Sequence, residues 1–274
     1  MLSTLKKIFK NLLSESAYRK IKIFFYFFID YNSRNYDASK DLKHNEDLLI
    51  SFGFEIDKIK SKLNSLNYNY YDERLSWHYH LFTGLKEYFK DQKINILEIG
   101  TYDGAFTNFI SKIYDNSKIT TIDLDDNDVK FTNFYQRNTL ENLNLHLEKR
   151  KININMQNIN FIKLNSIDIK KYFVENKFDL IWIDGDHLNP QVTIDIINSI
   201  DLLNKNGVIC TDDIVMNFNF VKDNYVSNES FLTLSHLESN NILKNYYFVK
   251  KIRKKNFYRK KYISLSIFQS NNFF

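Results

Sequence analysis

The ten residues LEIGTYDGAF, Leu97–Phe106, decide the fold of this chain. They close an apolar run that begins at Ile94, carry Gly100 and Gly104 in a short turn, and lead into apolar residues at helical spacing. This order predicts a buried strand, a tight turn and a helix. A dinucleotide-binding turn needs a further glycine so that the backbone can approach a pyrophosphate, and Tyr102 stands in its place. The turn therefore favours a ligand that carries no phosphate there.

Short apolar runs alternate with helical stretches over the next hundred residues. We expect strands at 94–99, 118–124, 160–164, 178–183 and 207–211, with helices at 105–114, 127–150 and 191–203 between them. Continuous apolar strands that alternate with helices form a parallel sheet covered on both faces. Two last apolar runs, 246–252 and 262–269, flank a basic turn. The predicted fold class is α/β, a Rossmann-like, doubly wound, mostly parallel sheet with a C-terminal antiparallel hairpin.

The beginning of the chain has a different pattern, with apolar residues at helical spacing and polar joints between them. We expect helices at 2–28, 41–51, 55–66 and 75–90. The sequence therefore predicts an N-terminal helical extension or cap over residues 1–74 and an α/β domain over residues 75–274.

Composition limits the setting of the protein. The chain has 274 residues, and its 43% of hydrophobic and 26% of charged residues are typical of a globular protein. Its one cysteine, Cys210, excludes a disulfide framework and a Cys/His zinc module, which favours the cytoplasm. No stretch reaches the roughly 20 apolar residues that span a bilayer.

Acidic residues follow three of the expected strands. Asp123 ends the second strand and is placed to accept hydrogen bonds from ribose hydroxyls. Asp184 follows the fourth strand in the run IDGDH, and Asp212 and Asp213 end the fifth. The last three carboxylates would repel one another unless something positive lies between them. Oxygen ligands suit Mg²⁺, Mn²⁺ or Ca²⁺, so a metal site is one prediction.

His187 stands three residues after Asp184 and is a candidate general base for a substrate hydroxyl, since its ordinary pKa lies near ~6.5. The alternative is structural. Asp184 and Asp213 would then cap helices, and His187 would be a solvated loop residue.

The span from about Leu75 to Ile214 resembles class I S-adenosylmethionine-dependent methyltransferases. The resemblance implies S-adenosyl-L-methionine as cofactor and a transferase activity. It implies a set of cofactor-binding residues: the turn with Gly100, Thr101 and Gly104 at the methionine part, Glu98 in support of that turn, Asp123 at the ribose, Asn165 and Ser166 at the adenine, and Asp184 beside them.

The pair of acidic clusters resembles metal-dependent O-methyltransferases of the catechol type, and the DGDH motif resembles those that methylate macrolide sugars. This resemblance implies Asp184, Asp212 and Asp213 as ligands of Mg²⁺ and His187 as the catalytic base. The function it implies is a metal-assisted O-methyltransferase that acts on a hydroxyl of a sugar or another small hydroxylated substrate.

Three other functions stay open: an RNA methyltransferase, an oxidising enzyme similar to cephalosporin hydroxylases, and a binding protein without turnover. Methylation of base amines is disfavoured because IDGDH replaces the N/D-P-P-Y/F motif. Basic residues gather at 6–22 and 250–261 within a net charge of +5. They are typical of solvated loops, and their functional interpretation is an anionic partner: a polysaccharide, a membrane surface or, less favoured, RNA. Homo-oligomerisation also stays open.

Overall fold

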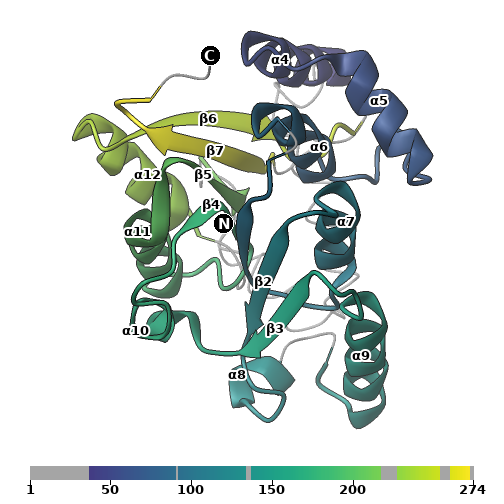
Figure 1. Cartoon of the computed structure of the whole chain (residues 1–274), viewed down its shortest axis with the longest axis vertical. Helices are drawn as coiled ribbons and strands as arrows, with labels where there is room; N and C mark the ends of the chain where they lie inside the picture. The colour runs from purple at the N-terminus through teal and green to yellow at the C-terminus, as the bar shows by residue number, and fades with distance from the viewer. Residues whose placement is uncertain (1–36, 91, 134–136, 217–226, 254–259, 272–274) are drawn as a thin grey trace, which may run out of the picture.

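A seven-stranded sheet forms the centre of the molecule in a computed structural model, which describes residues 37–90, 92–133, 137–216, 227–253 and 260–271 (Figure 1). The strand order is β3-β2-β1-β4-β5-β7-β6. The strands are β1 (Asn95–Ile99), β2 (Lys118–Asp123), β3 (Ile159–Lys163), β4 (Phe178–Ile183), β5 (Leu203–Ile214), β6 (Leu243–Val249) and β7 (Tyr262–Phe268). The first five pair in parallel and β7 pairs antiparallel with β5 and β6. The predicted fold class is confirmed.

Helices follow most of the strands. They are α4 (Ala38–Ser51), α5 (Ile56–Ser65), α6 (His78–Tyr88), α7 (Ala105–Ile113), α8 (Val129–Thr132), α9 (Leu140–Asn153), α10 (Ile169–Tyr172), α11 (Gln191–Leu202) and α12 (Glu229–Ser239), with a 3₁₀ turn at Ser166–Asp168. The predicted helix 127–150 is in fact α8 and α9, and α12 was not predicted. The predicted helix 2–28 lies outside the described residues. No helix in the described part of the chain is long and apolar enough to span a membrane.

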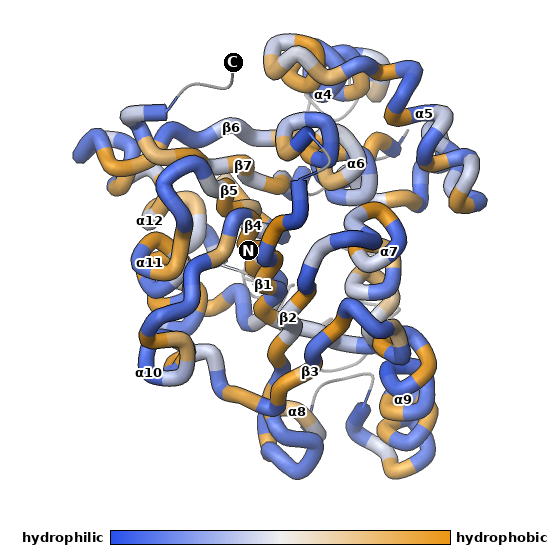
Figure 2. The backbone as a smooth tube through the Cα atoms, viewed as in Figure 1, coloured by the Kyte–Doolittle hydropathy of each residue, from blue (hydrophilic) through white to orange (hydrophobic). Residues whose placement is uncertain are grey.

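The sheet separates two hydrophobic cores, because alternate side chains of a strand point to opposite faces. Ile96 of β1 and Trp182 of β4 pack with α6 and α7 on one face. Leu97 and Ile181 pack with α10, α11 and α12 on the other. Hydrophobic residues accordingly gather along the central strands in Figure 2, and the two groups of helices lie on opposite sides of the sheet in Figure 1.

Helices α4 and α5 share the first of these cores. Leu49 of α4 and Ile59 and Leu63 of α5 are fully buried in it. The boundary at residue 74 stays a prediction, but the described part of the extension packs directly on the sheet domain.

The buried side chain of Asn45 joins α4 to the edge strand β6. Its amide nitrogen donates to the carbonyl of Val249 at 2.9 Å, and its oxygen accepts the Val249 N–H at 2.8 Å. The amide thus satisfies backbone groups that have no neighbouring strand, which also protects the edge from pairing with another chain.

We expect Asn45→Ala to lower the free energy of unfolding by about 1–3 kcal/mol, because it leaves the buried N–H and C=O of Val249 without partners. Urea denaturation measures the change. Lys43→Ala on the same helix is the control: it removes an exposed ion pair with Asp47, worth only about 0.3–0.5 kcal/mol. Equal losses in the two variants would contradict the role given to Asn45.

Candidate active site

The predicted site residues lie at the carboxyl ends of the parallel strands and on the loops that follow them, where folds of this kind bind ligands. The turn after β1 comes first. Gly100 has φ +101°, and a Cβ atom there would lie 2.3 Å from the carbonyl oxygen of Asp184. Gly104 has φ +72°, and a Cβ atom there would lie 2.8 Å from Ile154. Both positions therefore require glycine, because other protein atoms lie too close to the turn to leave room for a Cβ atom.

Glu98 and Thr101 support this turn from inside the protein. The buried Glu98 carboxyl accepts hydrogen bonds from Thr107 at 2.5 Å and Thr121 at 2.6 Å. The buried hydroxyl of Thr101 lies 2.7 Å from that of Thr121. Burial raises the pKa of Glu98 to about 8. The two residues hold β1, β2 and α7 together beneath the loop.

Asp123 ends β2 and closes the same turn. One carboxylate oxygen accepts the Tyr102 N–H at 2.9 Å and the other accepts the Leu124 N–H at 2.8 Å. Burial raises the pKa of Asp123, against the effect of these hydrogen bonds and of Arg137. Each oxygen has a second lone pair, so the carboxylate can still accept hydrogen bonds from two ribose hydroxyls. This free acceptor capacity fits the cofactor that the sequence implies.

Asn165 and Ser166 make local contacts after β3. The Asn165 side chain accepts the Ile167 N–H at 3.1 Å and so caps the 3₁₀ turn. The Ser166 hydroxyl accepts a hydrogen bond from Gln191 at 2.7 Å. Their contact with an adenine stays a prediction.

Asp184, Asp212 and Asp213 lie together at the ends of β4 and β5. Consecutive residues of a regular strand point to opposite faces, but the pairing of β5 with β7 is irregular between Thr211 and Ile214. Asp213 has φ +52°, a conformation that aspartate tolerates better than most residues. This irregularity turns both neighbouring carboxylates toward one place.

Two lysines from the C-terminal hairpin reach these carboxylates. The Lys250 ammonium contacts Asp212 Oδ2 and lies 2.5 Å from Asp213 Oδ1, while the Lys261 ammonium contacts Asp213 Oδ2. Burial opposes ionisation, yet Lys250, with His187 and Lys261, holds the pKa of Asp213 well below its ordinary range. The site is therefore a buried network of charges. Each buried charge in it needs a partner of opposite charge, because an unpaired buried charge is costly.

His187 completes the network. Its Nε2 atom lies 3.5 Å from Asp184 Oδ1 and 3.9 Å from Asp213 Oδ2. Burial alone would lower the pKa of His187, but the two carboxylates raise it. Burial, and then the neighbouring Asp212, raise the pKa of Asp184. Three acidic side chains are thus matched by two ammonium groups and one imidazole.

A metal ion does not fit this arrangement. At an effective dielectric constant near 20, two unit charges 4 Å apart interact by about 4 kcal/mol, so each ammonium would repel a dication by roughly twice that amount. Within the described ranges, no group of three or more His, Cys, Asp and Glu side chains is arranged to hold a metal ion. The positive charge that was predicted between the acids is supplied here by lysine, and the predicted Mg²⁺ ion is not confirmed.

The basic turn 250–261 was predicted to be solvated or to bind an anion, and this needs correction for three of its lysines. Lys250 and Lys261 neutralise the strand-end acids, and Lys260 pairs with Asp41 of α4. Residues 254–259 lie outside the described part. Sequence reasoning missed Lys250 and Lys261, although the antiparallel hairpin it predicted returns beside β5.

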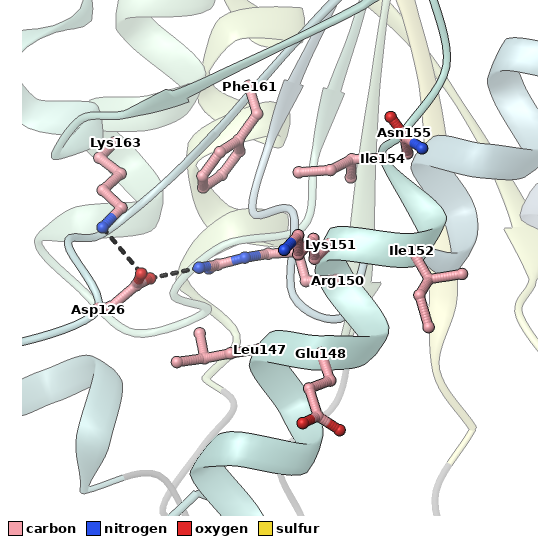
Figure 3. A pocket seen from close by; sticks show the side chains of 10 residues that line it. All are labelled: Asp126, Leu147, Glu148, Arg150, Lys151, Ile152, Ile154, Asn155, Phe161 and Lys163. Atoms are coloured by element: carbon pink, nitrogen blue, oxygen red, sulfur yellow. Dashed lines mark hydrogen bonds and ion pairs between the residues drawn. The ribbon is translucent and has the colours of Figure 1, made fainter.

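A cavity of about 770 Å³ lies elsewhere, between the C-terminal end of α9 and the edge strand β3 (Figure 3). Arg150 and Lys163 both point toward Asp126 in it, and Lys163 Nζ lies 2.8 Å from that carboxylate. None of the predicted site residues lines this cavity, so we do not assign it to the cofactor.

A comparison with known protein families finds a match over the part of the chain that holds the site. Residues 97–214 match the model of a family described as a methyltransferase domain. This span of the chain is therefore similar to a methyltransferase domain. The matched span begins in β1 and ends with β5, so it contains every predicted site residue. No functionally curated protein matches the chain.

Solved structures similar to this chain share little sequence with it. Cofactor-bound Rv0187 from MTB is 17% identical, with 70% of this chain and 80% of that one covered and a TM-score of 0.49. An O-methyltransferase from Bacillus cereus in complex with SAH is 16% identical, with 78% and 90% covered and a TM-score of 0.45. The fibrillarin pre-rRNA processing protein of Methanococcus jannaschii is 19% identical, with 65% and 68% covered and a TM-score of 0.43.

We expect Asp123→Ala to weaken S-adenosylmethionine binding by about ten- to a hundredfold, because charge-assisted hydrogen bonds are worth roughly 1.5–3 kcal/mol. Isothermal titration calorimetry measures the affinity. Asp125→Ala is the control, since this exposed acid of the same loop pairs with Lys163. An unchanged affinity in Asp123→Ala would contradict the prediction that Asp123 binds the ribose of the cofactor.

A second prediction concerns Glu98 and pH. The folded-state pKa of about 8 lies above the unfolded value, so the stability linked to its proton is full below about pH 4.5 and is lost as pH rises through 8. At roughly 1.4 kcal/mol per pKa unit, the loss is on the order of a few kcal/mol. We expect Glu98→Gln, which keeps an acceptor for both threonines, to gain stability over the native chain between pH 5.5 and 8.5. Urea denaturation at the two pH values measures this, and a constant difference would contradict it.

Proposed function

We propose that this methyltransferase transfers a methyl group from S-adenosylmethionine to a hydroxyl oxygen of a small hydroxylated substrate, such as a sugar. The observation that supports this proposal is the position of His187. Its imidazole lies at the carboxyl edge of β4, within 3.5 Å of Asp184 and 3.9 Å of Asp213.

An imidazole at this place suits an oxygen acceptor. A neutral alcohol is a poor nucleophile, and its proton must leave as the new bond forms. His187 would take that proton, and the Asp184 and Asp213 carboxylates would stabilise the imidazolium that results. This is the role that a buried carboxylate has beside a catalytic histidine in general.

The transfer itself balances without an added co-reactant. S-adenosylmethionine, when bound, supplies a methyl group on a positively charged sulfur. The acceptor oxygen forms the new bond to carbon, the electron pair of the broken carbon–sulfur bond stays on sulfur, and the hydroxyl proton goes to His187. Asp123 and the Gly100 turn would bind the cofactor at the neighbouring strand ends.

The contacts of the C-terminal hairpin weigh against the RNA alternative. Lys250, Lys260 and Lys261 face carboxylates of the protein itself. These three lysines are therefore already neutralised and are not placed to bind phosphates, whereas the other basic residues of the turn are Lys251, Arg253 and those at 254–259.

We expect His187→Ala to reduce turnover at least about a hundredfold, because a positioned base is typically worth 10²- to 10⁴-fold. The affinity for S-adenosylmethionine should stay nearly unchanged. Turnover is measured by formation of S-adenosylhomocysteine across a panel of sugars and phenols, with calorimetry for the cofactor.

The control is His236→Ala, which removes an exposed histidine of α12. Near-native turnover of His187→Ala on the best acceptor of the panel would show that another group removes the proton. Turnover on RNA and on none of the small acceptors would overturn the proposed substrate class.

A further inference from the structure

The ammonium group of Lys250 has the position that a divalent ion would need. It contacts Asp212 Oδ2 and lies 2.5 Å from Asp213 Oδ1, so it joins the two carboxylates that end β5. Its charge also acts on Asp184, the third predicted ligand. The Lys250 side chain is 15% exposed, and Asp212 is 2% exposed.

The backbone of Lys250 is fixed on both sides. Its carbonyl accepts the Trp77 N–H at 2.8 Å and the Ser76 hydroxyl at 3.4 Å, both just before α6. Its N–H donates to the carbonyl of Lys261 at 2.9 Å. The backbone of Lys250 is therefore held in place by hydrogen bonds to two other segments of the chain, which is not the case for a typical surface lysine.

We propose that the Lys250 ammonium replaces the divalent ion in this methyltransferase, so that the acidic cluster works without a metal and becomes a metal site only when this ammonium is removed. Two of its three N–H donors serve Asp212 and Asp213. The third can serve the acceptor oxygen, which a metal ion would otherwise bind and orient. Lys250 is thus a positioning residue that also holds positive charge beside the reacting oxygen.

Asp212 offers a second sign that the cluster is poised to take a cation. Its Oδ1 atom is buried and has no hydrogen-bond partner among the residues that the structure describes. Loss of Lys250 would free Asp212 Oδ2 and Asp213 Oδ1 beside it. Several carboxylate oxygens would then face one small space, which is the donor set that Mn²⁺ and Mg²⁺ prefer.

A titration of the full chain with Mn²⁺ tests this inference. Electron paramagnetic resonance measures the free Mn²⁺, and calorimetry measures the affinity. We expect no Mn²⁺ site in the native chain and one site in Lys250→Ala, with at least a tenfold gain in affinity. The double variant Lys250→Ala, Asp212→Asn should lose that site. Lys260→Ala is the matched control: it removes a neighbouring hairpin lysine that pairs with Asp41, and it should gain no site.

A native chain that binds one Mn²⁺ and loses it in Asp212→Asn would overturn the inference, and so would Lys250→Ala that folds and binds none. If Lys250→Ala does not fold, Mn²⁺ binding by the native chain and by Lys250→Arg still tests the inference. Both should bind no Mn²⁺, and native turnover should be unchanged by EDTA. The Mn²⁺ readout needs no acceptor, so failure of the proposed O-methyl transfer and failure of this inference are separate results.

Discussion

Three carboxylates that share one edge of a sheet need positive charge between them, and this need organises the C-terminal half of the molecule. Asp184 and the pair Asp212–Asp213 meet because β4 and β5 are parallel neighbours. The compensating lysines come from the hairpin. Strand β7 runs antiparallel to β5, so it begins where β5 ends, and β6 in turn ends where β7 begins. The order β5-β7-β6 therefore delivers Lys261 and Lys250 to the acids.

Most of the fold can be predicted from the sequence because the buried strands have continuous apolar runs. The run FDLIWI gives β4 at its observed bounds, Phe178–Ile183. The apolar pattern does not predict strand residues whose place in the sheet depends on backbone hydrogen bonds alone. Strand β5 already begins at Leu203, through the exposed Lys205 and Asn206, because its backbone pairs with Phe178 across an irregular register. Helix α12 has few core residues, Leu234 and Leu237 among them, so its pattern is weak.

The acids of the site were predictable and their partners were not. Glycines and acids stand at strand ends, which the apolar runs locate. The role of a lysine depends on which strand lies next to it in the folded sheet. In the sequence, Lys250 and Lys261 belong to a basic run that looks like any solvated turn. Three converging carboxylates led us to predict a metal ion between them. The contacts of the hairpin place the ammonium groups of Lys250 and Lys261 there.

The N-terminal helices contribute to the site through this same lysine. Asn45 of α4 holds both backbone groups of Val249, the residue before Lys250, and Trp77 and Ser76 at the start of α6 bind the Lys250 carbonyl. The position of the ammonium is therefore fixed by two helices that lie before β1 in the chain. A shift of either helix would move the cation relative to Asp212 and Asp213, since a buried charge network tolerates little change in distance. The helical extension is thus part of what arranges the charges at the strand ends.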